Sequence, residues 1–197
     1  MNRVLEIVKN RRSIRKYLPD QIKDNELASI LEAGTYAPSG HNCQPWHFLV
    51  IQDKEVINYI NDKTKQQMIG ASEEWAAKMG RAEQYHTLHN APTVIIVSGS
   101  KEAHSPLPLA ATGTSYTPLV DCAASIQNML IAAESLGIGS CWIGVINYLF
   151  ALPLEMEKLG IPEHYQPYFA VTLGYKAKSA LEVTATERRT NIISYIR

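Results

Sequence analysis

Three short runs of bulky apolar residues constrain the fold of this chain more than any other feature. They span 46–51, 93–97 and 168–173, and Pro, Gly or Asp stands at their edges. Runs of this length are too short for helices and are typical of strands that are buried on both faces. A further strand is expected over 141–146. The sequence therefore predicts a sheet at the centre of the molecule.

Apolar residues between these runs recur at helical spacing, which predicts helices that cover the sheet. Asp24 is a good N-cap for one helix, Gly34 stands where that helix would stop, and Gly137 ends a longer one. The apolar faces are Val4, Leu5 and Val8; Leu27, Ile30 and Leu31; Val56, Ile57 and Ile60; and Val120, Ala124, Met129, Ala133 and Leu136. Helices that alternate with buried strands indicate an α/β or α+β layered fold, and we expect one domain over 1–197.

Charge and cysteine content exclude several classes of protein. Lys plus Arg number 19 and Asp plus Glu number 19, so no global field would hold nucleic acid or an anionic membrane. The 3 cysteines lie far apart, which gives neither a disulfide framework nor a C-x-x-C pair. Polar residues break the longest apolar segments before they reach the length of a membrane span, and no export-signal pattern is evident. We expect a cytoplasmic protein without nucleic-acid or membrane partners.

A cluster of cations follows the first expected helix. The segment 11–15 reads R-R-S-I-R in a chain that is otherwise neutral. Arg forks and a Ser hydroxyl are groups that bind phosphate, and a fixed Arg also suits a cofactor that becomes anionic. A solvated basic turn is the alternative interpretation. A second pair, Arg188 and Arg189, would bind a dianion far better together with the first cluster than alone.

Two other segments suggest contacts with a ligand. In A-P-S-G-H-N-C-Q-P-W, over 37–46, Pro and Gly fix a turn from which Ser39, Asn42 and Gln44 can offer hydrogen bonds, although an ordinary helix-to-strand connection is the alternative. The stretch G-I-G-S-C-W-I-G, over 137–144, follows a helix and enters a strand, which is the reverse of a dinucleotide-binding loop. Its glycines more simply end the helix and permit close approach of a flat ligand.

The histidines raise the alternative of a metal site. His41 and His47 lie on an extended segment that would aim only some side chains at one point, and no carboxylate accompanies them. His86 and His89 could share one helix face, but two ligands do not complete a site, and exposed histidines on a surface helix are the simpler interpretation. We therefore predict no metal. The segment 99–118 is predicted to be a long loop.

Four segments in order resemble the nitroreductase family of FMN-dependent oxidoreductases. They are R-R-S-I-R-K-Y, A-P-S-G-H-N-C-Q-P-W-H-F, D-C-A-A-S-I-Q-N-M-L-I-A-A-E-S-L-G-I-G-S-C-W-I-G and the late R-R. The match spans nearly the whole chain, and only 66–118 shows no pattern of the family. The resemblance implies an α+β fold with a central, mostly antiparallel sheet flanked by helices. It also implies an intertwined homodimer that holds two FMN molecules at its interface.

The same resemblance assigns roles to individual residues. One subunit would hold the flavin with Arg11 toward the phosphate and Arg15, the catalytic residue, toward the N1 and O2 edge. The set of cofactor-binding residues that it implies is Arg11, Arg12, Ser13, Arg15, Pro38, Ser39, Gly40, Asn42, Trp142, Ile143, Gly144, Arg188 and Arg189, with Gln44 as a weaker addition. Pro38 to Asn42 would reach the flavin of the other subunit, and 142–144 would lie against the ring near N5.

The activity implied by the resemblance is hydride transfer from NADH or NADPH through FMN to a small electrophilic acceptor, such as a nitro compound or a quinone, in a ping-pong cycle. A cation at N1 would stabilise the negative charge of the reduced flavin. The alternatives are a relative that reduces an enone, free flavin or a halogenated aromatic, and a flavin-binding module without turnover. Many family members carry an acidic residue beside the glycine near N5, where this chain has Trp142 and Ile143.

Overall fold

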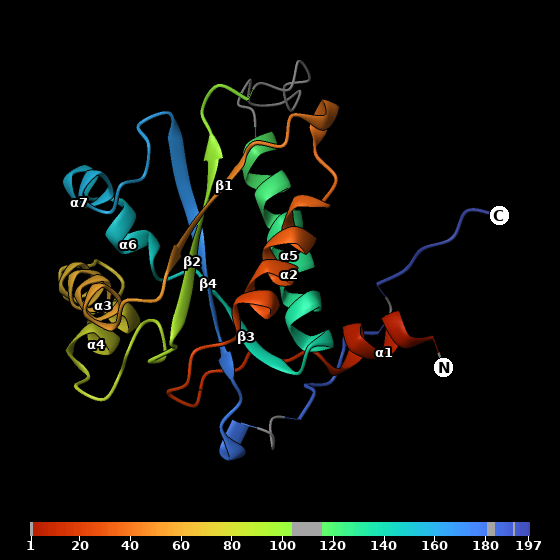
Figure 1. Cartoon of the computed structure of the whole chain (residues 1–197), viewed down its shortest axis with the longest axis horizontal. Helices are drawn as coiled ribbons and strands as arrows, with labels where there is room; N and C mark the ends of the chain where they lie inside the picture. The colour runs from red at the N-terminus through yellow and green to blue at the C-terminus, as the bar shows by residue number, and fades with distance from the viewer. Residues whose placement is uncertain (1, 104–115, 181–183, 191) are drawn as a thin grey trace.

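The structure, a computed structural model, describes residues 2–103, 116–180, 184–190 and 192–197. At its centre is a sheet in the order β1-β2-β4-β3, in which every neighbouring pair is antiparallel (Figure 1). The strands are β1 (Trp46–Ile51), β2 (Thr93–Ser100), β3 (Ile138–Ile143) and β4 (Tyr165–Tyr175). The α+β fold with an antiparallel sheet is therefore confirmed.

Helices cover both faces of this sheet. On one face, α2 (Asp24–Thr35) and α5 (Thr117–Ser135) form a core with β2 and β4 around Ile30, Ile126 and Val171. On the other face, α3 (Lys54–Ile69), α6 (Asn147–Phe150) and α7 (Pro153–Lys158) form a second core. The helix α4 (Glu74–Arg81) packs on α3. Two apolar layers thus hold the sheet rigidly between them.

Several sequence-based bounds need correction. The helix that follows Asp24 was expected to stop at Gly34, but α2 continues to Thr35. A Cβ on Gly34 would lie 2.5 Å from the Met129 side chain. This glycine therefore permits close packing of α2 on α5. Gly137, with φ of +76°, ends α5 as predicted, but the next strand starts at once at Ile138 rather than at Cys141.

The expected burial and loops also differ in places. The strand β1, at one edge of the sheet, is mostly half-buried, whereas the central strand β2 is buried almost throughout. Gly99 and Ser100 belong to β2, and Thr117 and Pro118 open α5, so the predicted loop is shorter. Its central residues 104–115 lie outside the described residues. In the part of the chain that the structure describes, no helix is long and apolar enough to cross a membrane.

Both ends of the chain lie apart from the layered body (Figure 1). The helix α1 (Arg3–Asn10) has no buried residue, although it contacts α5. In the described part of the C-terminal segment after residue 183, every residue is exposed and none is helical or paired as a strand. The apolar side chains Ile192, Ile193 and Ile196 are each at least 69% exposed. An isolated chain therefore leaves apolar surface in water.

Candidate active site at the edge of the sheet

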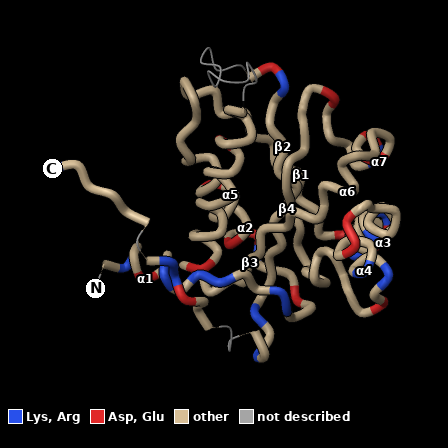
Figure 2. The backbone as a smooth tube through the Cα atoms, turned by 180° about the vertical axis from the view of Figure 1, so that it is seen from behind, with Lys and Arg blue, Asp and Glu red and all other residues tan. Residues whose placement is uncertain are grey.

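The basic segment lies along the free edge of β3. The main-chain N–H of Ile14 donates to the Ser140 carbonyl at 2.9 Å, and a parallel bridge pairs Ser13 with Ser140. A Cβ on Gly139 would lie 2.9 Å from Ile14, so the absence of a side chain there lets the segment approach. Figure 2 shows Lys and Arg gathered along the chain that leaves α1. The edge of the sheet thus carries a fixed line of cations.

The segment that contains Ser13 and Arg15 lies next to the thiol of Cys141 on β3, and both side chains act to lower the pKa of that thiol. Burial is the largest cause that raises the pKa of this thiol, and the positive charge of Arg15 opposes the rise. Arg15 itself is exposed. The guanidinium therefore lies within electrostatic reach of the strand and is open to a ligand.

Tyr85 and His89 lie within electrostatic reach of Arg15, and the sequence did not predict this for either residue. Burial, followed by the charges of Arg15 and His86, lowers the pKa of His89 to about 4. Burial raises the pKa of Tyr85, and Arg15 again opposes it. The segment 84–90 is not the surface helix that we expected but a series of turns, and His89 is half-buried. The only sequence signal was the close spacing of two histidines just before a buried strand.

Arg12 and Arg11 take different positions. One guanidinium nitrogen of Arg12, Nη1, donates to the carbonyls of Lys9 at 2.6 Å and Arg11 at 2.8 Å, which satisfies acceptors where α1 ends. Its buried Nε has no hydrogen-bond partner among the described residues. Arg11 is half-buried and its charge acts on the Cys141 thiol. Arg11 is therefore close to Arg15, and Arg12 serves the end of the helix.

The late arginines do not join this cluster within one chain. Arg188 and Arg189 are exposed on the C-terminal segment, and among the described residues no hydrogen bond or ion pair fixes either of them. The predicted meeting of Arg11 and Arg189 thus stays a prediction.

The loop that contains Ser39 is held in a tight conformation. The main-chain N–H of Gly40 donates to the Asp121 carboxylate at 3.2 Å and 3.3 Å, and the N–H of Gln44 donates to Ser39 Oγ at 3.0 Å. The amide of Gln44 donates to Asn42 Oδ1 at 3.1 Å. His41, Asn42 and Gln44 all have positive φ, which costs free energy and persists only where such contacts enforce it. Asp121 is the residue here that sequence reasoning missed.

This loop and the arginines lie at opposite ends of α5. Asp121 lies near the start of the helix and Glu134 near its end. Glu134 forms an ion pair of 2.9 Å with Lys176, and an isolated β-bridge pairs Lys176 with Tyr17 of the basic segment. At a rise of 1.5 Å per residue, Asp121 and Glu134 are about 20 Å apart along the helix. One chain therefore does not bring Asn42 to the ligand edge that holds Arg15.

The segment 142–144 continues β3 past Cys141. Trp142 packs edge-to-face on Phe169, with ring centroids 5.0 Å apart, and Ile143 is buried. A Cβ on Gly144 would meet no atom of the described residues within 4 Å, so the described part of the chain leaves space beside this backbone. Trp142 follows Cys141 directly in the chain. The segments 13–15 and 142–144, both predicted to contact the flavin, therefore lie at the same edge of the sheet.

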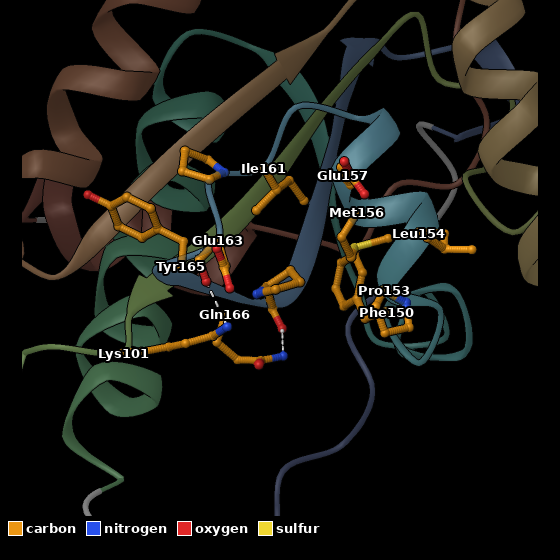
Figure 3. Close-up of a pocket in the computed structure, with 12 residues that line it drawn as sticks. Lys101, Phe150, Pro153, Leu154, Met156, Glu157, Ile161, Glu163, Tyr165 and Gln166 are labelled. Carbon is orange, nitrogen blue, oxygen red and sulfur yellow. Dashed lines mark hydrogen bonds between the residues drawn. The ribbon is translucent and has the colours of Figure 1, made fainter.

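A large cavity lies elsewhere among the described residues. It encloses about 640 Å³ between α7 and the start of β4, and its walls include Phe150, Met156, Ile161 and Tyr165 (Figure 3). Lys101 at its rim already donates to the Glu163 carbonyl at 2.7 Å. No predicted site residue lines it. We place the candidate site at Arg15 because the charged and hydrogen-bonding groups converge there. Within the described ranges, no three His, Cys, Asp or Glu side chains gather as metal ligands.

Comparison with known proteins identifies the family of this chain. The sequence profile described as the nitroreductase family matches residues 8–175. The chain belongs to the nitroreductase family. A curated relative from Archaeoglobus fulgidus, provisionally named NADH dehydrogenase/NAD(P)H nitroreductase, is 35% identical over 176 residues, which are 89% of this chain and 86% of the relative.

Solved nitroreductase structures are similar throughout. A nitroreductase with bound FMN from Bacteroides fragilis has a TM-score of 0.87 and 34% identity, with 100% of both chains covered. A nitroreductase with bound FMN from Desulfitobacterium hafniense has a TM-score of 0.80 and 26% identity, again with 100% of both covered. A further curated relative, the FMN reductase (NADPH) of Bacillus subtilis, is 27% identical over 182 residues, which are 90% of this chain and 67% of the relative.

Proposed function

We propose that this nitroreductase-family chain is an NAD(P)H-dependent FMN oxidoreductase that reduces a small electrophilic molecule in a ping-pong cycle. The observation that carries the proposal is Arg15, an exposed cation on a segment that pairs with the edge of β3 next to Cys141. FMN, when bound, supplies the hydride chemistry between the nicotinamide and the acceptor. Relatives with FMN in their structures and NAD(P)H in their names support this class of enzyme.

The residues present fit FMN. Arg11, Ser13 and Arg15 offer cationic and hydroxyl groups suited to phosphate and to the polar edge of the ring. The open space at Gly144 allows a flat group to approach the backbone. We assign Arg15 to the N1 and O2 edge, Arg11 to the phosphate, and 142–144 to the ring near N5. The buried, unpaired Nε of Arg12 suits a further acceptor.

Arg15 acts by electrostatics in this proposal. The main chain of its segment is paired with β3, so a positive charge already stands at this edge when negative charge forms next to it. Donor and acceptor then use the same open side of the site in turn, which is the basis of the ping-pong order. No acid or nucleophile of the protein is required.

We further infer that the active unit is a homodimer with shared sites. Asn42 and Arg15 lie toward opposite ends of α5, so a flavin held by Arg15 meets the Ser39–Asn42 loop only of another subunit. Exposed apolar side chains on α1 and on the C-terminal segment give such a dimer surface to bury. The tail would also carry Arg188 and Arg189 to a phosphate. A cytoplasmic location and a single domain over 1–197 stay predictions.

The absorbance spectrum of the purified protein is the first test. We expect the bands of oxidised flavin, and their loss on anaerobic addition of NADH or NADPH. A protein that binds no FMN after reconstitution would overturn the proposal. Flavin bands that neither nucleotide bleaches would instead identify a flavin-binding module without turnover. Reoxidation rates with a nitroaromatic, a quinone, an enone, a halogenated aromatic and free FMN would then rank the acceptors.

A further inference from the structure

A smaller cavity, of about 380 Å³, lies at the end of the sheet where β1 ends and β2 begins. Its walls come from the chain that follows Arg15, from the connection between β1 and α3, and from the residues that precede β2. None of the residues that we assign to FMN lines it. The cavity is therefore separate from the candidate active site, and an inference about it does not rest on the proposed function.

The apolar part of this cavity is rigid. Ile57 and Ala91, which line it, are buried. The ring of Tyr17 is fixed, because its hydroxyl donates to a main-chain carbonyl at 2.6 Å. A Cβ on Gly174 would lie 2.8 Å from Pro92 and 3.0 Å from Tyr17, so β4 packs tightly against both of these walls. A fixed surface of aromatic, proline and aliphatic groups suits a flat ring.

One hydrogen-bond acceptor in the cavity is oriented by a network of side chains. Gln52 Nε2 donates to Gln21 Oε1 at 3.1 Å and to Thr93 Oγ1 at 3.2 Å. The hydroxyl of Thr93 donates to the same oxygen of Gln21 at 2.7 Å. Gln21 Nε2 donates to the main-chain carbonyls of Gln52 at 3.2 Å and Pro92 at 2.6 Å. The network fixes which way the Gln52 amide points, and Gln52 Oε1 keeps no hydrogen-bond partner among the described residues.

Two further amides line the same cavity. The side chains of Asn58 and Asn90 form no hydrogen bond within the part of the chain that the structure describes. Asn90 has φ of 52°, and its main-chain N–H donates to His86 Nδ1 at 3.3 Å. Such strain persists where contacts enforce it, and it is concentrated at functional sites. Lys54 is the one charged residue among those that line the cavity, so no carboxylate there would neutralise a cationic ligand.

We propose that this cavity binds a planar, uncharged heterocycle of the size of a nucleobase. An N–H group of the ligand would donate to Gln52 Oε1, and a neighbouring acceptor of the ligand would accept from the amides of Asn58 and Asn90. Purines and pyrimidines carry such a pair of groups on one edge: adenine has an exocyclic N–H beside a ring nitrogen, and uracil has a ring N–H beside a carbonyl. The cavity volume of about 380 Å³ falls within the usual range for small-molecule sites, about 300–1,000 Å³.

NMR titration of the ¹⁵N-labelled protein, loaded with FMN, tests the site with two nucleosides. Adenosine carries the purine edge and uridine the pyrimidine edge. We expect at least one of them to shift the side-chain amide signals of Gln52, Asn58 and Asn90 with a Kd of about 1 mM, since only the ring is bound. The nucleoside that binds more tightly identifies the class of ring. The riboside of 6-dimethylaminopurine and 3-methyluridine lack the N–H donor and should bind at least about 5-fold more weakly.

Three variants locate the binding. Gln52→Leu removes the oriented acceptor, Asn58→Ala removes one amide, and Asn90→Gly removes the other while it tolerates the positive φ. Each should weaken the nucleoside about 5-fold, which corresponds to one hydrogen bond. The matched control is Asn25→Ala, which removes an exposed asparagine from the first turn of α2 and should not change the affinity.

Thermal unfolding shows whether each variant is folded. Gln52→Leu also breaks the network with Gln21 and Thr93, so Asn58→Ala and Asn90→Gly decide the question if that variant does not fold. Three results would each overturn the proposal: neither nucleoside shifts the three amide signals, the methylated compounds bind as tightly as their parents, or the folded variants bind as tightly as Asn25→Ala. None of these results bears on whether NADH or NADPH bleaches bound FMN, so the proposed function would be judged separately.

Discussion

The main-chain N–H of Gly40 points at the carboxylate of Asp121, 3.2 Å from Oδ2. The pair joins the Ser39–Asn42 loop to the start of α5. Three residues in this loop or just after it have positive φ. Burial raises the pKa of Asp121, and the hydrogen bond from Gly40 opposes that rise. The buried carboxylate of Asp121 therefore serves as the hydrogen-bond acceptor for the main chain of the loop.

Asp121→Ala should lower the free energy of unfolding by about 1.5–3 kcal/mol, since it removes a hydrogen bond to a charged group and leaves the Gly40 N–H without its acceptor. Asp121→Asn keeps an acceptor oxygen and should lose less. Urea unfolding measures both, and fluorescence titration with FMN reports the effect on the loop. Equal stability of the two variants and the wild type would show that Asp121 does not hold the loop.

Two glycines on or next to β3 should respond in opposite ways to the same substitution. Gly139→Ala places a Cβ 2.9 Å from Ile14 and should destabilise the fold by about 1–3 kcal/mol. Gly144→Ala meets nothing and should change stability by less than about 0.5 kcal/mol, yet weaken FMN binding if the ring lies against this backbone. Thermal unfolding and FMN titration separate the two effects. Unchanged FMN affinity of a stable Gly144→Ala protein would remove Gly144 from the ring contact.

Arg15→Ala should leave the protein folded and slow flavin reduction by NAD(P)H roughly 30- to 1,000-fold, or about 2–4 kcal/mol, by analogy with the removal of other electrostatic donors. The reason is the loss of the cation fixed next to the developing negative charge. Stopped-flow absorbance measures the rate. The matched control is Lys16→Ala, which removes a neighbouring exposed cation. A normal rate at full FMN occupancy would exclude Arg15 from the mechanism.

Shared sites predict complementation between inactive subunits. Mixing an Asn42→Ala protein with an Arg15→Ala protein under subunit exchange should restore part of the activity, because a mixed dimer has one site that carries both substitutions and one that carries neither. Mass spectrometry under native conditions verifies the exchange. Complete lack of recovery in proven mixed dimers would place both residues on the flavin of the same chain.

His89 should also make stability depend on pH. Its pKa falls from an ordinary 6.5 to about 4 in the folded protein, so the unfolded chain binds a proton more readily. The contribution is present in full above pH 6.5, falls as the pH drops below that value, and is lost by about pH 4, a change of about 3 kcal/mol. Urea unfolding of the wild type and His89→Asn across this range measures it. Parallel pH profiles would mean that His89 titrates normally.

The sequence by itself determined the elements and the family. Continuous apolar runs predicted β1, β2 and β4, and helical periodicity with Gly137 predicted α5, because burial patterns and helix ends depend on neighbours in the chain. The family membership inferred from the four segments is confirmed, as is the antiparallel sheet that the resemblance implied.

Only the tertiary structure decided which distant groups act together. Asp121 holds Gly40 across 81 residues of sequence, and no local pattern marks a carboxylate on an apolar helix as the partner of a loop. The segment 84–90 forms turns, where spacing suggested a helix, because Asn61 and Lys65 of α3 bind it. The length of α5 separates Asn42 from Arg15. Contacts of this kind depend on packing in three dimensions, which the order of residues along the chain does not display.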